Sequence, residues 1–319
     1  MRKALMAVVL SSAFVVGAYA KEQTGTIISI DEGAKTFVCK WEDKTWNYRT
    51  TPKTAFRVKG KNGTFSDIKA GVRVNVGYHT DDKGRITVQH NCLLLTSESP
   101  GADGRPVRVL IETGSGDKLD AKSREIFEIG DRSILTALAE VSCDPATIDH
   151  VLVTHLHFDH AGGLTRRPKP GESAQWTGPG SAGDSPVVRT FANAKVWTQA
   201  REWADALANR SVMTRTYFRD HLEPLTPQLQ FVDSPRPFPA GYTPGRDERP
   251  TWPVECRLTP TAPGVDVFLV PGHTWGQQAI AFSDTAGRRV VFTPDVIPTA
   301  AHVGQTYSLG YDVEPYTSM

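Results

Sequence analysis

The stretch VTHLHFDHAGG, residues 153–163, decides how this 319-residue chain is interpreted. It continues an apolar run that predicts a buried strand. His155 and His157 stand two apart, and residues two apart on an extended segment point to the same side. Their imidazoles are therefore expected to face one cation. Asp159 and His160 lie past the strand end, where the chain turns, and can face a second cation.

The residue types in this stretch are those of a metal site. Neutral imidazole and carboxylate are ligands that zinc accepts, in sites that leave one position open for water. Gly162 and Gly163 follow, and glycine lets a backbone turn without Cβ clashes. A chance run of histidines is the plain alternative, but the position between an apolar strand and a glycine turn favours metal binding. His150, at the start of the strand, is expected to be a solvated histidine.

Two later positions fit the same site. His273 follows an apolar strand predicted over Val265–Val270, and Asp295 follows one predicted over Arg289–Phe292. They are separated by 295 − 273 = 22 residues, which is enough for a hairpin of neighbouring strands. Either residue alone would carry little weight, but beside the histidine cluster both are candidate ligands.

Together these residues resemble the metallo-β-lactamase-fold superfamily. The likeness is greater to its lactonase and organophosphate-hydrolase-like branch, through THLHFDHAGGL (154–164), PGHTWGQ (271–277) and FTPDVIPTAAH (292–302). It covers about Cys92 to the end of the chain and implies an α/β fold, the αββα sandwich. The classical zinc β-lactamases are a poorer match, because their cluster usually lacks the histidine found at His160.

The resemblance also implies a set of metal ligands. It assigns a first metal to three histidines and a second to an Asp–His pair, with one carboxylate bridging both. The cofactor would be two Zn²⁺, or other divalent ions such as Mn²⁺, Fe²⁺ or Co²⁺. The implied ligands of the first metal are His155, His157 and His273. Those of the second metal are Asp159 and His160, and the implied bridging carboxylate is Asp295.

This ligand set predicts hydrolysis. Two cations lower the pKa of a shared water and make hydroxide available for attack on an ester, lactone or phosphoester. Asp295 would bridge the two metals, and Asp159 could orient the nucleophile. The binding partner of the protein would be a small-molecule substrate. Two alternatives remain open. One is a single-metal enzyme similar to glyoxalases or persulfide dioxygenases, and the other is a catalytically impaired metal-binding protein with a ligand-binding β-module.

The chain departs from the family pattern at two places. Glu112 stands in the early strand-end motif, LIETG, where the family usually has Asp. The family also expects one more histidine, a few dozen residues after the bridging Asp, on the second metal. The histidine that follows here is His302, only 302 − 295 = 7 residues after Asp295. We therefore expect one metal to bind tightly and the second weakly, with low activity, unless His302 substitutes for the absent ligand.

The N-terminus predicts export. Arg2 and Lys3 precede the apolar run Ala4–Val16, and Ala18-Tyr19-Ala20 follows as a small-x-small cleavage site. The run is too short to span a bilayer as a helix, so no stable membrane insertion is expected. Residues 1–20 are interpreted as a signal peptide, which places the mature protein in a periplasm or outside the cell.

Residues 21–90 and 91–319 predict two different domains. The first reads as short strands between turns, typical of a small β-barrel-like module similar to OB-like modules. It contains 13 Lys/Arg and 8 Asp/Glu residues, so its net charge is 13 − 8 = +5. A solvated module explains this charge better than a nucleic-acid site, and the whole chain carries only +1. In the second, strands alternate with helices expected at Ser133–Val141 and Thr198–Ala208, which favours an α/β layered domain.

Overall fold

The computed structural model divides the chain into two compact units. One comprises residues 1–12 and 89–319, and the other residues 13–88. Each is described by itself. The structure describes residues 5–11, 21–32, 36–41, 44–49, 56–58, 61–63, 66, 73–78, 90–127, 129–181, 183–210, 216–239, 242, 245, 248–250, 253–297 and 312–314.

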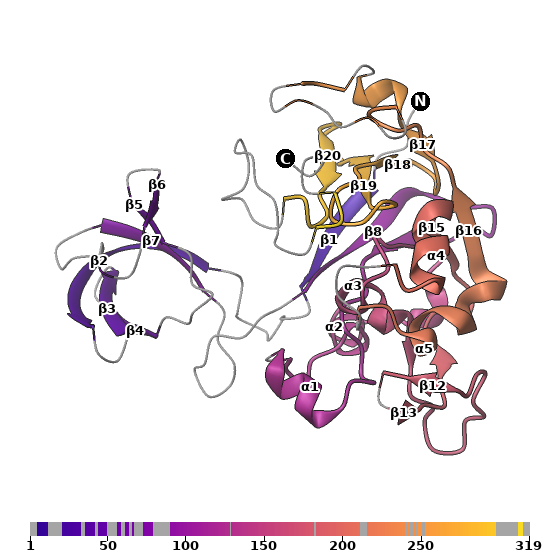
Figure 1. Cartoon of the computed structure of the whole chain (residues 1–319), viewed down its shortest axis with the longest axis horizontal. Helices are drawn as coiled ribbons and strands as arrows, with labels where there is room; N and C mark the ends of the chain where they lie inside the picture. Colours follow the sequence, from indigo (N-terminus) through magenta and orange to yellow (C-terminus); the bar gives the residue numbers. More distant parts are fainter. Residues whose placement is uncertain are drawn as a thin grey trace. The chain divides into compact units, whose positions relative to one another are not determined.

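The larger unit contains a six-stranded sheet in the order β1-β8-β9-β10-β15-β16 (Figure 1). The strand pairs from β9 to β16 are parallel, and β8 pairs antiparallel with both β1 and β9. Parallel strands place their carboxyl ends at one edge of a sheet, where ligands bind in α/β folds. The strands are β1 (Leu5–Ser11), β8 (Asn91–Pro100), β9 (Pro106–Ile111), β10 (His150–Leu152), β15 (Lys195–Gln199) and β16 (Leu229–Val232).

A second sheet of four antiparallel strands has the order β17-β18-β19-β20. Its strands are β17 (Thr259–Pro260), β18 (Val265–Leu269), β19 (Gln278–Ser283) and β20 (Arg289–Phe292). The predicted strands before His273 and Asp295 are therefore present. The sequence suggested that these two strands are neighbours. That prediction was wrong, because β19 lies between them.

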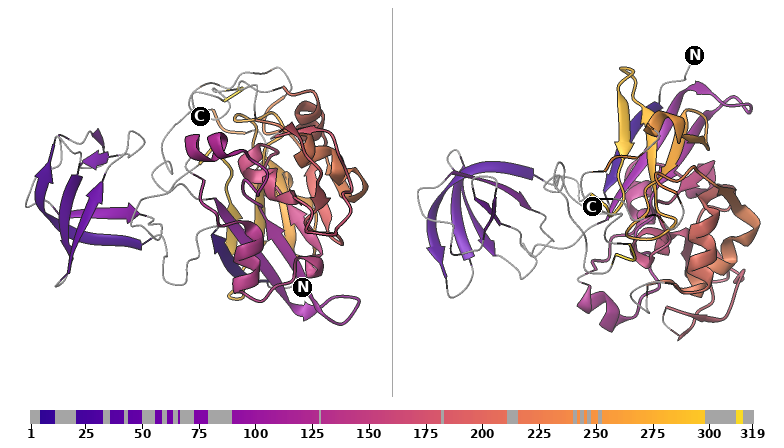
Figure 2. Two further views of the ribbon diagram at one scale, coloured as in Figure 1. Left: turned by 90° about the horizontal axis from the view of Figure 1, so that it is seen from below. Right: turned by 45° about the horizontal axis from the view of Figure 1, so that its top comes forward.

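The two sheets pack face to face (Figure 2). Side chains alternate along β9: Val109 and Ile111 join the core between the sheets, and Leu110 joins the core on the opposite face. The core between the sheets includes Val267 and Ile280 from the second sheet. Three layers of the predicted αββα sandwich are thus in place: helices, first sheet and second sheet.

The helices cover the outer face of the first sheet, as Ile134 and Leu138 of α2 share a core cluster with Leu110. The outer face of the second sheet packs Phe268 against Val254, in the short turn η5. The α-helices are α1 (Ala121–Ile126), α2 (Ile134–Glu140), α3 (Phe158–Ala161), α4 (Ala200–Leu207) and α5 (Arg219–Leu222). The 3-10 turns are η2 (Pro145–Thr147), η3 (Gly162–Leu164), η4 (Glu223–Gln228) and η5 (Val254–Cys256).

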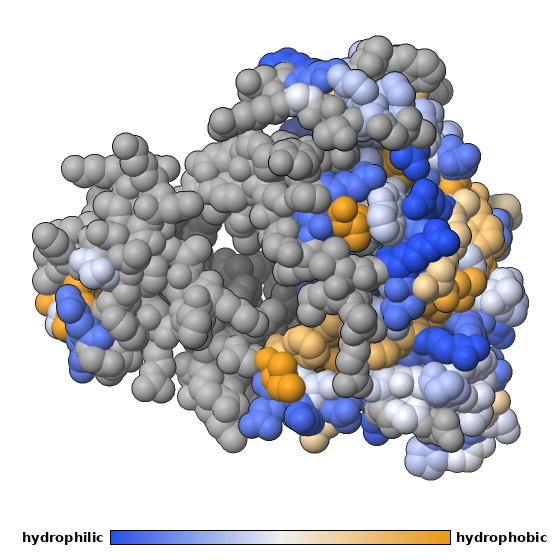
Figure 3. Space-filling model, viewed as in Figure 1, coloured by the Kyte–Doolittle hydropathy of each residue, from blue (hydrophilic) through white to orange (hydrophobic). Residues whose placement is uncertain are grey.

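Two small hairpins complete this unit. The first pairs β11 (Thr165–Arg166) with β14 (Val188–Arg189), and the second pairs β12 (Pro179–Gly180) with β13 (Gly183–Asp184). In Figure 3, hydrophilic and hydrophobic residues are interspersed over this unit, with an apolar spot over α1. Ile126 and Phe127 are exposed at that helix.

The smaller unit contains a four-stranded antiparallel sheet in the order β4-β3-β2-β7, and a separate hairpin of β5 and β6. Ile27, Phe37 and Cys39 are buried in it. The short strands expected from the sequence are present, and closure into a barrel stays a prediction. The strands are β2 (Lys21–Asp31), β3 (Thr36–Trp41), β4 (Lys44–Arg49), β5 (Phe56–Val58), β6 (Lys61–Gly63) and β7 (Arg73–Tyr78).

Further sequence predictions concern the helix at Thr198, the cysteines and the membrane. The helix predicted from Thr198 begins two residues later, because Thr198 and Gln199 pair with Phe231 and Val232 in β16. The four cysteines, Cys39, Cys92, Cys143 and Cys256, are free thiols. Among the described helices, none is long and apolar enough to cross a membrane. The domain boundaries predicted from the sequence stay predictions.

Candidate metal centre

Strand β10 delivers the histidine motif to the carboxyl edge of the first sheet. The strand ends at Leu152, and the following loop carries His155 and His157. His157 is the N-cap of α3, and Asp159 and His160 lie within that helix. The sequence prediction that the chain turns directly after the two histidines is confirmed.

The two glycines after α3 allow a second loop to approach closely. A Cβ on Gly162 would lie 2.3 Å from the carbonyl oxygen of Ser115, and one on Gly163 would lie 2.3 Å from that of Thr113. The φ of Gly162 is −59°, which any residue can adopt. Glycine is therefore needed at these two positions because the neighbouring loop approaches so closely. The sequence had suggested that the turn of the backbone itself required glycine.

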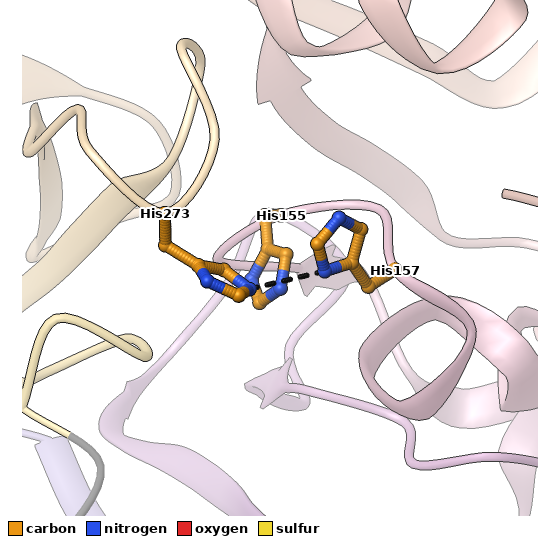
Figure 4. A group of neighbouring side chains, drawn as sticks. All are labelled: His155, His157 and His273. Atoms are coloured by element: carbon orange, nitrogen blue, oxygen red, sulfur yellow. Dashed lines mark hydrogen bonds between the residues drawn. The ribbon is translucent and has the colours of Figure 1, made fainter. Parts of the chain in front are cut away.

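Three histidines form a buried group (Figure 4). His155, His157 and His273 are at most 5% exposed, and they offer ring nitrogens that all lie within 4.8 Å of one another. Nδ1 of His157 and Nε2 of His273 are 3.1 Å apart. Residues separated by more than a hundred positions thus converge, as the sequence motifs predicted.

A second group adjoins the first. His155, His160 and Asp295 offer ligand atoms that also lie within 4.8 Å of one another. Asp295 stands between the groups: Oδ1 is 3.4 Å from Nε2 of His160, and Oδ2 is 3.4 Å from Nε2 of His273. Oδ2 of Asp159 lies 3.6 Å from the same Nε2 of His160. All six candidate ligands therefore lie in one cluster, with His155 shared between the groups.

The first group fits a cation. Nε2 of His155 is buried without a hydrogen-bond partner, and a buried polar atom without a partner is costly. Nδ1 of His157 and Nε2 of His273 approach so closely that a proton or a cation must lie between them, since two lone pairs repel. Tetrahedral zinc with Zn–N bonds of about 2.0–2.1 Å separates its ligand atoms by about 3.3 Å. The 3.1 Å spacing is close to that value.

The electrostatics differ between the groups. Burial lowers the pKa of His155 well below its usual value, and the charges of His160, His157 and His273 lower it further. Burial and His273 likewise lower the pKa of His157. Both imidazoles are therefore neutral near pH 7, which is the form that binds metals.

His160 experiences the opposite field. Burial acts to lower the pKa of His160, but the charges of Asp159, Asp295 and Glu112 outweigh it and hold that pKa well above the usual value. Burial acts to raise the pKa of Asp295, but the charge of His160 and a hydrogen bond from it lower that pKa instead. The second group thus carries an excess of negative charge that suits a cation.

Glu112 ties the histidine motif to the end of β9. Its side chain is buried, and Oε1 accepts a hydrogen bond of 2.7 Å from the backbone N–H of Thr154. Oε2 lies 3.1 Å from Nδ1 of His160. Such an outer carboxylate fixes the orientation of a metal-binding histidine. Glu112 therefore takes this role although the family usually has the shorter Asp.

Sequence reasoning missed two further carboxylates. Nδ1 of His273 lies 2.9 Å from Oδ1 of Asp312, which comes from the C-terminal segment. Glu202 on α4 accepts hydrogen bonds from Leu156 and Thr274, which are next in sequence to three candidate ligands. Neither carboxylate lies in a recognisable motif, because both contacts arise from long-range packing.

The remaining candidates have different outcomes. His302, the possible substitute ligand, lies outside the described residues. His150 is half-buried, and its Nδ1 accepts a hydrogen bond of 3.0 Å from Nε1 of Trp197. The prediction of a solvated histidine was therefore wrong, because β15 brings Trp197 beside it.

Comparison with known proteins agrees with this geometry. A family model described as the metallo-beta-lactamase superfamily matches residues 86–167. No curated protein matches the chain. Among solved structures, a probable metal-dependent hydrolase from Staphylococcus aureus is 20% identical with a TM-score of 0.57, covering 100% of this chain and 82% of that one.

Two other solved structures are less similar. A quorum-quenching N-acyl homoserine lactone lactonase is 15% identical with a TM-score of 0.47, covering 100% of this chain and 85% of that one. AidC, a dizinc quorum-quenching lactonase, is 16% identical with a TM-score of 0.45, covering 79% of this chain and 68% of that one. The family match covers the segment that carries the histidine motif, and the TM-score of 0.57 indicates that the chain shares its fold with the probable metal-dependent hydrolase.

Proposed function

We propose that this chain is a metal-dependent hydrolase that holds two divalent cations and cleaves an ester, lactone or phosphoester. The position of Asp295 carries the proposal, because its two oxygens each lie 3.4 Å from a histidine of a different group. A carboxylate placed in this way can bridge two cations about 3.5–4 Å apart. The superfamily match over residues 86–167 supports the same class of enzyme.

Each candidate ligand has a role in this proposal. The first cation would be held by His155, His157 and His273. The second would be held by His160 and Asp159, and Asp295 would contribute to both sites. Bound Zn²⁺, or Mn²⁺, Fe²⁺ or Co²⁺, would supply a Lewis acid and a water of lowered pKa. The carboxylate of Asp159 would also orient the attacking water by accepting a hydrogen bond from it, and Asp295 lies within 3.4 Å of a histidine from each group.

The substrate reaches this centre from the side of the second group. The side chains of Asp159, Asp295 and His160 are 32%, 24% and 16% exposed, whereas the histidines of the first group are buried. A small acyl or phosphoryl compound can therefore approach the second group while the first group stays protected from water.

A substrate panel with controlled metal content tests the proposal. Chain treated with a chelator and then freed of it is expected to be inactive, because its histidines alone do not generate hydroxide near pH 7. Added Zn²⁺ or Mn²⁺ is expected to restore turnover of a lactone, an aryl ester or a phosphotriester. Turnover that chelation leaves unchanged would contradict the proposal. A single bound iron with activity on thiol-linked substrates would instead indicate the glyoxalase or dioxygenase class.

We also propose that the protein is exported and loses residues 1–20. The apolar core of the proposed signal overlaps β1, which pairs with β8 from Leu5↔Ser97 to Ser11↔Asn91. Removal of the signal would leave β8 as the edge strand of its sheet. Expression in a bacterium with N-terminal sequencing is expected to give a mature start at Lys21, and Ala20→Arg is expected to block processing. A mature chain that keeps Leu5–Ser11 would show that the segment serves as a strand instead.

A further inference from the structure

The loop that carries His273 is contacted by a segment from much further along the chain, residues 312–314. His273 follows β18 and approaches the first group from a loop separate from that of the other two histidines (Figure 4). The backbone N–H of Glu314 donates to the carbonyl oxygen of Gly272 at 2.8 Å. Nδ1 of His273 lies 2.9 Å from Oδ1 of Asp312. One short segment thus contacts two successive residues of the loop.

The backbone around His273 is not held by a strand. β18 ends at Leu269, and Gly272 has a φ of +146°, a conformation that favours glycine. The N–H of Gly272 donates to the carbonyl of Thr274 at 3.0 Å. Because glycine loses more conformational freedom on folding than any other residue, contacts from outside the loop help to decide where the ring of His273 lies.

The contact between Asp312 and His273 is buried. Each of the two side chains is 1% exposed. Taking a carboxylate out of water is costly unless it accepts hydrogen bonds, and a hydrogen bond to a charged group is stronger in such surroundings than in water. An ionised carboxylate only accepts hydrogen bonds, so the neutral ring of His273 donates from Nδ1 and keeps the lone pair on Nε2.

Nε2 is the nitrogen of His273 that faces the first group. It lies 3.1 Å from Nδ1 of His157 and 3.4 Å from Oδ2 of Asp295. On the outer side of the group, Nδ1 of His155 lies 3.0 Å from the hydroxyl of Thr154, and Nε2 of His157 is buried without a hydrogen-bond partner. Among the contacts described for these outer nitrogens, the one made by His273 is therefore the one that involves a carboxylate.

We propose that Asp312 is a positioning residue of the metal centre, whose carboxylate holds His273 in the tautomer and orientation that present Nε2 to the first cation. A carboxylate in this position also makes the imidazole a more basic ligand. The backbone contact between Glu314 and Gly272 holds the segment against the loop. The inference rests on the proposed function, because it assumes that the first cation binds between the three histidines.

Metal titration of the full chain tests the inference independently of activity. Metal-free protein is titrated with Zn²⁺ against a chromophoric chelator. Asp312→Ala is expected to raise the dissociation constant of the first cation about 10- to 100-fold. Asp312→Asn keeps an oxygen that accepts from His273 but lacks the negative charge, so its increase should be smaller. Asp233→Asn, the same change at an exposed position, should bind the cation as the parent chain does.

NMR of the imidazole nitrogens adds a measurement that a purely structural role would not change. In long-range ¹H–¹⁵N spectra of the metal-free parent chain, His273 is expected to carry its proton on Nδ1. A His273→Gln variant identifies its signals. In Asp312→Ala the form with the proton on Nε2 should become populated, because the acceptor that favours Nδ1–H has been removed. Asp312→Asn should keep the parent tautomer.

The outcomes separate the inference from the proposed function. Circular dichroism and thermal unfolding show whether each variant is folded. Folded Asp312→Ala that binds the first cation as tightly as the parent chain would overturn the role of Asp312 and leave the hydrolase proposal intact. If Asp312→Ala does not fold, the same result in Asp312→Asn would overturn it. A parent ring of His273 protonated on Nε2 would also overturn it. A parent chain that binds no cation would remove the proposed function, and this inference with it.

Discussion

His157→Ala is expected to abolish hydrolysis, with turnover reduced more than about a thousandfold and the first cation lost. Changes to the outer partners of a metal ligand already cost roughly 10- to 100-fold in metal affinity or activity, and this change removes a proposed ligand itself. Nδ1 of His157 is 3.1 Å from Nε2 of His273, and both rings are buried. No other described side chain of the first group can fill the gap, because His155 and His273 are held by their own loops.

The measurement pairs turnover with metal content. The variant is compared with the parent chain on whichever substrate of the panel is turned over, and the bound metal is counted by mass spectrometry. His150→Ala is the matched control, because it removes a half-buried imidazole that contacts Trp197 instead of the metal groups. Turnover near the parent level in His157→Ala would refute the proposed mechanism.

The candidate site could be predicted where its residues are adjacent in sequence. His155 and His157 lie in the loop that follows β10, and Asp159 and His160 lie in the short helix after it, so the four side chains are close together in sequence and in space. His273 was a candidate because it follows a predicted apolar strand, and its convergence with the motif is a property of the folded sandwich.

The outer residues could not be predicted in this way. Asp312 meets His273 across 39 residues, and Glu202 meets Leu156 across 46. Such contacts depend on how loops from different layers pack, and a spacing rule applied along one segment contains no information about them.

The fold shows the same division. Strands with β-branched or large apolar residues, such as Val265–Val270 and Arg289–Phe292, were predicted from the sequence and are confirmed in β18 and β20. Strand β19, QAIAFS, was missed because alanine and glutamine favour strands weakly. Its residues pair on both sides, with β18 and β20, so its neighbours stabilise a conformation that its own residues do not favour.

Glu202→Ala is expected to destabilise the protein strongly and to weaken the first metal group as well. Glu202 is fully buried in the first turn of α4. Its Oε1 accepts hydrogen bonds from the N–H of Leu156 at 2.9 Å and the hydroxyl of Tyr217 at 3.2 Å, and its Oε2 accepts one from Thr274 at 2.5 Å. Leu156 stands between His155 and His157, so one carboxylate connects the loops that carry all three histidines.

Removing this carboxylate leaves one buried N–H and two hydroxyls without their acceptor. Each buried donor left without a partner costs about 1–3 kcal/mol, so a loss of at least about 3 kcal/mol is expected, a large part of the roughly 5–15 kcal/mol that stabilises a typical domain. Because the two ligand loops are then free to separate, the affinity for the first cation should fall about 10- to 100-fold. Glu202→Gln keeps one acceptor oxygen, and the rotatable hydroxyl of Thr274 can accept from its amide, so its losses should be intermediate.

Denaturant unfolding of the metal-free chain separates the two effects, because a purely structural residue would change stability without changing metal affinity once folding is complete. Glu125→Ala, an exposed position on α1, serves as the matched control and should change neither quantity appreciably. If Glu202→Ala unfolds at a lower denaturant concentration yet, when folded, binds the first cation as tightly as the parent chain, then Glu202 supports the fold alone. If both quantities fall together and Glu202→Gln restores part of each, the carboxylate positions the metal ligands, because only a group that joins both ligand loops links the two measurements.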